Sequence, residues 1–230
     1  MNPIIVDATP FHIDLDHLLK VLHIEHDDDD DAAKVKHLAA EAQAVARPRG
    51  MFREAYVEAR GDDHIVAGGI TFTSRVLSVN LAGIHRVFPF IATCGSELDD
   101  WSASITDMFH RYWADKIKET VLGHAIRAVN ERMAEHFNLK ATATMNPGSL
   151  EDWPIYQQRQ LFELLGWPAD AIGVHLSESF LMIPTKSISG LRFPTEVTFE
   201  NCQLCPRDQC PGRRAPYDES LFDRKYRKQA

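Results

Sequence analysis

The sequence predicts a mixed α+β fold, in which a twisted, largely antiparallel sheet is flanked by helices. Short apolar or alternating segments bounded by turn residues recur along the chain, which is typical of strands. One much longer segment, residues 96–136, keeps apolar residues at helical spacing and is expected to be the main helix. Hydrophobic residues make up 44% of the 230 residues, which is enough to bury a core without cross-links.

Residues 1–95 are expected to form the N-terminal part of one domain. Strands are predicted over 4–8, 51–59, 64–72 and 86–93, and helices over 14–24 and 31–46. The turn Gly61-Asp62-Asp63 joins two of these strands as a hairpin. Gly68 and Gly69 lie inside the second of the two and predict a bulge or a close backbone approach. The acidic run from Asp27 to Asp31 precedes a helix whose positive end suits carboxylates, so a structural role explains it.

Residues 96–200 are expected to complete that domain. The helix that begins at Ser96 is long for a globular protein, so a break is predicted near His110 to Asp115 or near Gly123. The elements expected after it are a strand over 140–145, a helix over 155–165, and strands over 172–176, 180–183 and 187–193. Residues 201–230 remain as a basic tail that holds three of the four cysteines.

The composition argues against several classes of function. A net charge of −8 without a stripe of Lys and Arg argues against nucleic-acid binding. No apolar run approaches the length of about 18 residues that a membrane-spanning helix needs. The first residues, MNPIIVDATPFHIDLD, lack the basic and apolar regions of a signal peptide. A cytoplasmic protein without membrane or nucleic-acid partners is therefore expected.

The four cysteines are the strongest local signal of chemistry. Cys202, Cys205 and Cys210 are close enough in the chain to converge on one ion or cluster, and Cys94 ends an apolar strand. In a reducing compartment such a group more often binds metal or does redox work than forms disulfides. Four thiolates are what a [4Fe–4S] cluster requires, provided that folding brings Cys94 to the tail. A zinc site and reduced thiols without metal are the alternatives.

Three arginines interleave with the cysteines of the tail. They are Arg207, Arg213 and Arg214. They would offset the negative charge of thiolates and could dock an acidic partner, or they solvate an irregular segment.

A series of short motifs occupies residues 146–190 in a fixed order. They are NPG at 146–148, QLFELL at 160–165, IGVHLSES at 172–179, MIP at 182–184 and SISG at 187–190. Together they resemble the PGY, LFxLL, IGxxLTES, MxP and SVSG elements of the activation domain of vitamin B12-dependent methionine synthase. The rest of the chain resembles that domain more loosely, by length and by the order of its elements.

The resemblance implies reductive reactivation of a corrinoid. One electron reduces inactive cob(II)alamin, and S-adenosylmethionine supplies the methyl group that traps the product. The residues that the resemblance places on the nucleotide or corrinoid side are Asn146, Pro147, Gly148, Glu178, Ser187, Ser189 and Gly190. In the family, an Arg-x-x-Pro-Gly-Tyr element helps to hold S-adenosylmethionine. Here Thr144 stands at the arginine position and Ser149 at the tyrosine position, which removes a guanidinium able to grip a carboxylate.

The sequence lacks the DxHxxG motif of corrinoid-binding proteins. A corrinoid would therefore be brought by a partner, either a corrinoid protein or the core of a cobalamin-dependent methionine synthase, with a reductant protein as a further partner. The hypothesis is a stand-alone relative whose cysteine tail carries its own electron source. Two alternatives stay open. One is an S-adenosylmethionine-binding methyltransferase component with structural zinc, and the other is a non-enzymatic module that docks on a corrinoid protein.

Overall fold

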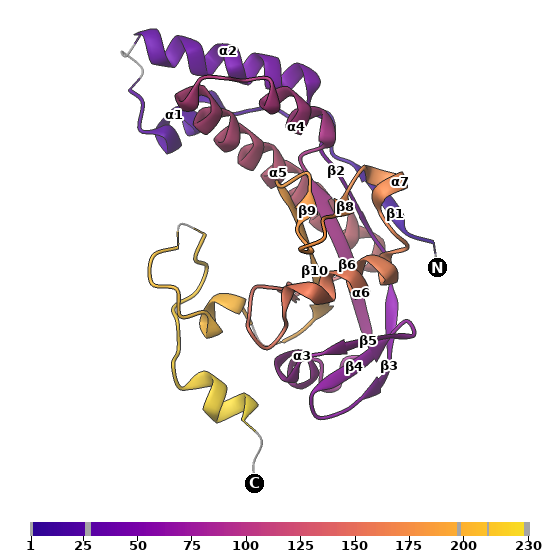
Figure 1. The fold of residues 1–230 in the computed structure, drawn as a ribbon. Helices are drawn as coiled ribbons and strands as arrows, with labels where there is room; N and C mark the ends of the chain where they lie inside the picture. Colours follow the sequence, from indigo (N-terminus) through magenta and orange to yellow (C-terminus); the bar gives the residue numbers. More distant parts are fainter. Residues whose placement is uncertain (1, 26–28, 197–198, 211, 228–230) are drawn as a thin grey trace.

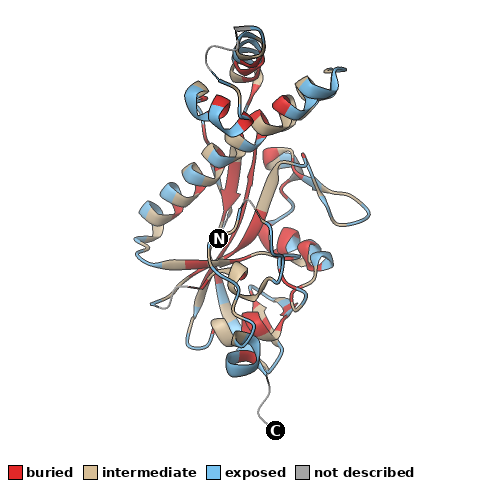
Figure 2. Cartoon of the chain, turned by 90° about the vertical axis from the view of Figure 1, so that its left-hand side faces the viewer, coloured by how far each residue is buried: buried red, intermediate tan, exposed pale blue. Residues whose placement is uncertain are grey.

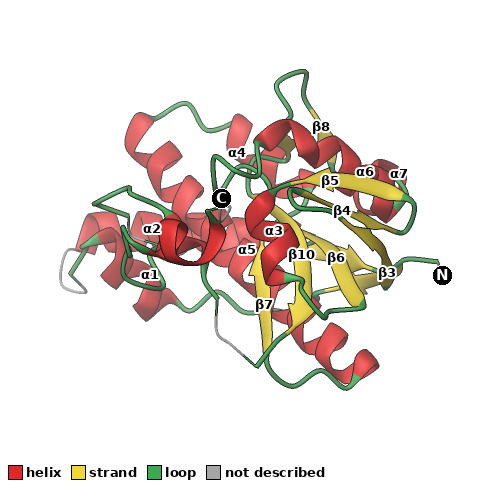
Figure 3. Cartoon of the chain, turned by 90° about the horizontal axis from the view of Figure 1, so that it is seen from below, coloured by secondary structure: helices red, strands yellow, loops and turns green. Residues whose placement is uncertain are grey.

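The structure is a computed structural model that describes residues 2–25, 29–196, 199–210 and 212–227. Asp27 and Asp28 of the acidic run lie outside these residues. The main sheet has eight strands, and its neighbouring strands pair in antiparallel fashion. One path through it runs β1 (Ile4–Asp7), β2 (Arg49–Phe52), β6 (Arg86–Thr93), β3 (Ala55–Arg60), β4 (His64–Ala67) and β5 (Ile70–Thr73). On the other side of β6 lie β10 (Ser187–Pro194) and then β7 (Thr142–Met145) (Figure 3).

Strand β6 is the centre of the sheet, and seven of its eight residues are buried. Its Pro89 lacks the N–H group that a central strand normally donates. The carbonyl oxygen of Pro89 accepts from Arg53 N at 3.2 Å, so the missing N–H faces the short link between β2 and β3. On this side of β6, strand β2 pairs with residues up to Phe90 and strand β3 pairs with Val87 and Arg86. Pro89 lies between these two paired segments and therefore interrupts neither.

Helices cover one side of the sheet and extend beyond its upper end (Figure 1). The four helices there are α1 (Leu15–Leu22), α2 (Asp29–Val45), α4 (Ser96–Ala103) and α5 (Met108–Phe137). The first half of α5 packs in a helical cluster through Ile117 and Val121, and its second half packs on the sheet through Ala125, Val129 and Met133. Within the described residues, no helix is long and apolar enough to cross a membrane.

The long helical region breaks earlier than the sequence predicts. The break lies between α4 and α5, and α5 continues through both predicted positions, His110 to Asp115 and Gly123. The Asp107 carboxylate accepts from His110 N at 2.9 Å and caps the new helix. The interruption is therefore set by a helix-capping residue.

The largest hydrophobic cluster lies on the opposite face of the sheet. Figure 2 shows buried residues in the strands at the centre of the molecule and exposed residues on the outer sides of the helices. The smaller elements of that opposite face are α3 (Arg75–Asn80), a 3₁₀ turn (Ile155–Gln157), α6 (Gln158–Leu165), α7 (Ala169–Ile172) and the two-stranded sheet of β8 (His175–Leu176) and β9 (Met182–Ile183). The predicted strand 64–72 is two strands, because Gly68 and Gly69 both have positive φ and turn the chain between β4 and β5. Part of the predicted strand 172–176 is the end of α7.

The described part of the tail packs against the domain. It contains a 3₁₀ turn (Asn201–Leu204) and a π-helical turn (Phe222–Tyr226). Tyr226 is 1% exposed and belongs to the same hydrophobic cluster as Phe199. Its hydroxyl donates to Asn80 Oδ1 at 2.8 Å, and its carbonyl oxygen accepts from Arg75 Nε at 3.0 Å. The tail is therefore fixed to α3 through Tyr226, and the part that holds Cys202, Cys205 and Cys210 runs between that anchor and the end of β10.

Candidate functional site

A cavity of about 810 Å³ lies where the Asn146 turn, β10 and the tail meet. Its volume is within the usual range of about 300–1,000 Å³ for small-molecule sites. Several predicted site residues line it, from both the motif region and the tail: Asn146, Pro147, Gly148, Ser187, Ser189, Cys202, Cys205 and Cys210. Folding therefore brings most of the nucleotide or corrinoid candidates and the three tail cysteines to one place.

The Asn146 turn forms one wall of the cavity. Ser149 N donates to the Asn146 carbonyl oxygen at 3.1 Å, and Gly148 N donates to the Trp153 carbonyl oxygen at 2.7 Å. Gly148 has a φ of +81°, and a Cβ there would lie 2.7 Å from Ile155 Cδ1. Because Trp153 is fully buried, the turn is attached to the core rather than free at the surface.

The Asn146 side chain joins the turn to its neighbours. Its amide Nδ2 donates to the Ser189 carbonyl oxygen at 2.6 Å, and its Oδ1 accepts from Asn201 Nδ2 at 3.0 Å. One residue thus connects β7, β10 and the start of the tail. Asn201 is 5% exposed, and its own Oδ1 has no hydrogen-bond partner among the described residues. The wall therefore contains a buried acceptor that none of the described residues uses.

Strand β10 supplies the second wall. Its register against β6 pairs Ser187 with Thr93 and Ser189 with Ile91. The Ser187 hydroxyl lies 2.8 Å from both the Thr93 hydroxyl and the Pro184 carbonyl oxygen. The Ser189 hydroxyl donates to Gln158 Oε1. Both serines are therefore held in place by neighbours before any ligand arrives.

Two of the predicted nucleotide or corrinoid residues, Gly190 and Glu178, are not among the described residues that line the cavity. A Cβ on Gly190 would lie 2.6 Å from the Met145 carbonyl oxygen and 2.7 Å from Asn146 Nδ2. Its missing side chain therefore makes room for Asn146 rather than for a ligand. Glu178 is exposed on the loop between β8 and β9, and it does not reach the cavity in this conformation.

The cysteine segment, residues 202–214, forms the third wall and is built around Arg213. The Arg213 guanidinium donates to the carbonyl oxygens of Cys202 at 3.2 Å and Cys205 at 3.3 Å, and also to that of Arg207. The Cys202 sulfur accepts from Arg214 N at 3.4 Å. This backbone hydrogen bond, aided by the two nearby guanidinium groups, lowers the pKa of the Cys202 thiol.

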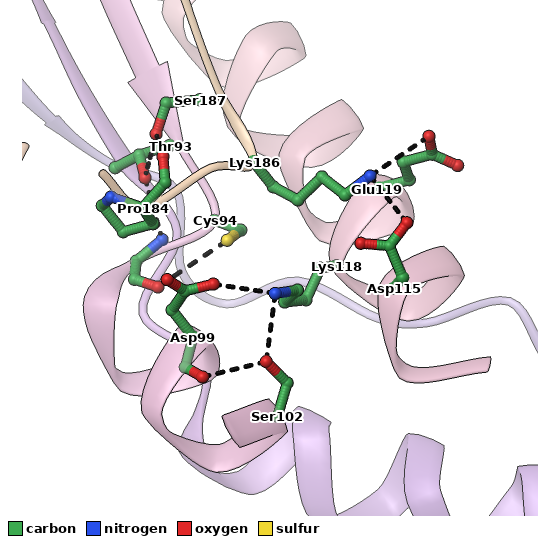
Figure 4. Close-up of polar contacts among 11 residues, drawn as sticks. Thr93, Cys94, Asp99, Ser102, Asp115, Lys118, Glu119, Pro184, Lys186 and Ser187 are labelled. Atoms are coloured by element: carbon green, nitrogen blue, oxygen red, sulfur yellow. Dashed lines mark hydrogen bonds and ion pairs between the residues drawn. The ribbon is translucent and has the colours of Figure 1, made fainter. Parts of the chain in front are cut away.

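Cys94 occupies a different environment (Figure 4). It is fully buried at the end of β6, in the helical cluster, and its thiol donates to the Gly95 carbonyl oxygen at 3.6 Å. Burial raises its pKa to about 12. Beside it Lys118 Nζ pairs with Asp99 Oδ1 at 2.7 Å, which ties α5 to α4. Cys94 is thus a neutral core thiol and not one of the described residues that line the cavity.

This arrangement does not support the predicted cluster. Across the residues that the structure describes, no group of three or more His, Cys, Asp or Glu side chains is placed to hold a metal ion. The three tail cysteines share a cavity without converging on a point, and Cys94 is a core residue with a raised pKa. The four thiols as placed therefore do not fit a [4Fe–4S] ligand set.

The cavity also contains residues that the motifs do not predict. They include Ile155, Gln158, Leu181, Thr185, Asn201, Arg207 and Arg214. Gln158 is the first residue of α6 and is 2% exposed. The sequence alone does not show that this amide side chain is buried. The arginines were visible in the sequence as neighbours of the cysteines, but their place on the same cavity as Asn146 depends on how the tail folds back.

Comparison with solved structures finds 13 chains with significant similarity. One is a crystal structure of the MetH reactivation domain bound to AdoHcy, with a TM-score of 0.62 and 14% sequence identity. The match covers 87% of this chain and 81% of that chain. The chain has the fold of a methionine synthase reactivation domain. No family model matches the sequence, and no curated protein matches it either.

The reactivation-domain fold confirms the predicted α+β class. Its curled antiparallel sheet with flanking helices is the architecture expected from the alternating strands and the long helix. The motifs between residues 146 and 190 therefore resemble the activation domain in a chain that also shares its fold, although the identity between the two chains is low.

Proposed function

We propose that this protein binds an S-adenosyl ligand in the cavity and helps to reactivate a corrinoid that a partner protein carries. One observation carries the proposal. The motif segments that resemble the activation domain, 146–148, 182 and 187–189, line a single cavity in a chain with the reactivation-domain fold. The neighbour of that fold has AdoHcy bound, and this chain has a cavity of suitable size.

The reaction proposed consists of an electron transfer followed by a methyl transfer. A low-potential one-electron donor reduces cob(II)alamin to cob(I)alamin. Cob(I)alamin then attacks the methyl carbon of S-adenosylmethionine, so that a cobalt–carbon bond forms and the sulfonium carbon–sulfur bond breaks. S-Adenosylhomocysteine leaves with the electron pair of that bond. The electron donor is a separate molecule, because the described thiols do not form a cluster site.

The chain's own residues would bind and orient the methyl donor in this reaction. Asn146 and Ser189 are fixed by hydrogen bonds, so the wall is organised before the ligand binds. The apolar side chains of Ile155, Leu181 and Met182 offer surface to a nucleoside. Ser187 and Ile188 lie at the start of β10, where the resemblance puts the corrinoid.

The test uses the core of a cobalamin-dependent methionine synthase from which its own reactivation domain has been removed. The core is loaded with cob(II)alamin and mixed with S-adenosylmethionine and a chemical reductant, and methylcobalamin is followed by its visible spectrum. We expect added wild-type chain to accelerate methylcobalamin formation. Thr185 is exposed and lines the cavity, so Thr185→Trp should block the acceleration by filling the cavity.

A matched control is Thr71→Trp, a bulky substitution at an exposed position of β5 outside the cavity lining, and it should keep full activity. Formation of a complex with the core but no acceleration would favour the non-enzymatic docking module instead. If the chain neither binds the core nor changes the rate, the proposed function is wrong.

A further inference from the structure

The cavity carries positive charge in a protein whose net charge is −8. Two arginines, Arg207 and Arg214, line it, and the lining residues that the structure describes include no carboxylate. The remaining polar groups on the lining are mostly hydroxyls and amides, from Ser187, Ser189 and Asn146. A ligand that fits these walls therefore has an anionic group as well as an uncharged part.

Arg214 is the better placed of the two arginines. Its backbone N donates to the Cys202 sulfur at 3.4 Å, and its guanidinium pairs with Glu200 Oε2 at 3.1 Å. Arg213 beside it fixes the segment by donating to several carbonyl oxygens. Arg214 is thus held both at its backbone and at its guanidinium, and 57% of its side-chain surface is still exposed. A guanidinium has five N–H donors, and its contact with one carboxylate oxygen leaves others free.

The motif position that would provide a guanidinium in the family carries Thr144 instead. Thr144 lies on β7, and its hydroxyl accepts from Arg192 Nε at 3.2 Å. The register places Arg192 directly opposite Thr144 on β10, and its guanidinium lies over the Phe90 ring, 5.8 Å from the centroid. Arg192 is thus engaged with strand residues and is not among the described residues that line the cavity. Arg214, by contrast, is one of the two arginines on the cavity lining, which also includes Asn146 and Asn201.

We propose that Arg214 of the cysteine segment binds the carboxylate at the amino-acid end of the S-adenosyl ligand and supplies the guanidinium that position 144 lacks. This inference rests on the proposed function, because it assigns one end of the same ligand. Asn201, which follows Glu200 in the sequence, also lines the cavity, and its Oδ1 is a buried acceptor without a described partner. The cysteine segment then acts as a wall that recognises the ligand rather than as a metal site.

The test compares two ligands that share the nucleoside and thioether. S-Adenosylhomocysteine carries the amino-acid end, and 5′-methylthioadenosine does not. Isothermal titration calorimetry of the full chain should show that Arg214→Gln weakens S-adenosylhomocysteine binding by about 10- to 100-fold, the usual effect of losing a charged hydrogen-bond pair. Its binding of 5′-methylthioadenosine should stay within about twofold of wild type.

Two variants serve as controls. Arg224→Gln removes a tail arginine that pairs with Asp218 at 3.0 Å outside the cavity, and it should change neither affinity. Glu200→Gln breaks the Arg214–Glu200 pair while keeping Arg214, and it should leave S-adenosylhomocysteine binding unchanged or tighter, because a competing carboxylate is gone. If the Arg214–Glu200 pair only held the cavity in shape, Glu200→Gln would weaken S-adenosylhomocysteine binding as much as Arg214→Gln.

Equal weakening by Glu200→Gln and Arg214→Gln would overturn the inference. An Arg214→Gln effect that is equal for both ligands or absent for both would overturn it too. These outcomes leave the proposed function standing, since wild type still binds the nucleoside. If wild type binds neither ligand, the proposed function itself fails. The two failures are therefore distinguishable in one set of titrations.

Discussion

At the scale of single residues, Asn146 holds the candidate site together. Its two side-chain hydrogen bonds reach Ser189 on β10 and Asn201 at the start of the tail. Neither contact could be predicted from the sequence, because the partners lie 43 and 55 residues away. The sequence singled out Asn146 only as part of the NPG motif, and the structure adds that its side chain is the link between three segments.

Gly190 makes this link possible, and its replacement provides a direct test. In Gly190→Ala the new Cβ would meet a backbone oxygen and the Asn146 amide. We expect the free energy of unfolding to fall by about 1–3 kcal/mol, as is usual for overpacking. Gly123→Ala is the control, since a Cβ there meets nothing within 4 Å and lies inside α5. It should raise stability by about 0.5–1 kcal/mol in the same urea titration. Equal effects of the two substitutions would contradict the packing described around Asn146.

The cysteines should differ in reactivity. Cys202, Cys205 and Cys210 are partly exposed, whereas Cys94 is buried with a pKa of about 12. A disulfide reagent should therefore label the three tail thiols in the folded protein and Cys94 only after unfolding. In Cys94→Ala the number of thiols labelled in the folded state should not change. Protection of the tail thiols together with bound iron would instead restore the cluster that the sequence suggested.

At the scale of elements, the sequence predicts which segments are strands or helices better than it predicts where they begin and end. The strands of the central sheet and the long helix were visible from apolar spacing, since that spacing reflects burial. Several boundaries were wrong or incomplete, two of them because of local backbone chemistry. Gly68 and Gly69 turn the chain through positive φ, and Asp107 starts a new helix where the apolar pattern continues. The convergence of tail and motif was not predictable, because tertiary contacts alone create it.

The start of α5 depends on Asp107 as its cap. Asp107→Ala should measurably lower the free energy of unfolding, because His110 N loses its acceptor. Asp100→Ala removes an exposed acid inside α4 and should change stability by less than about 0.5 kcal/mol. Chemical unfolding of both variants at one pH compares them. A result in which Asp100→Ala is the more damaging would show that charge, and not capping, determines the effect.

At the scale of the whole molecule, the tail belongs to the domain's core. Tyr226 is buried with its hydroxyl on Asn80, and burial raises its pKa from 10.0 to about 12. The fold thus favours the protonated phenol. Its contribution to stability is complete below about pH 10 and is lost as the pH rises from there to about 12, because in this range the phenol ionises mainly in the unfolded chain.

Tyr226→Phe separates this effect from the rest of the alkaline titration. At neutral pH the variant should be less stable by about 0.5–1.5 kcal/mol, because the hydrogen bond to Asn80 is lost. Between about pH 10 and 11.5 its stability should decline less steeply than that of wild type, since phenylalanine does not ionise. Urea unfolding across this range measures both effects. Parallel declines for the two proteins would mean that the Tyr226 hydroxyl is not buried and that the tail is not anchored to α3 as described.

The Asn146 turn, β10 and the cysteine segment together are proposed to form a binding site for an S-adenosyl ligand. Calorimetric titration of the full chain with S-adenosylhomocysteine tests it most directly. We expect saturable binding of one ligand per chain, lost in Thr185→Trp and kept in Thr71→Trp, because of these two positions only 185 lines the cavity. Absence of binding to the wild-type chain, or equal binding by both tryptophan variants, would contradict it.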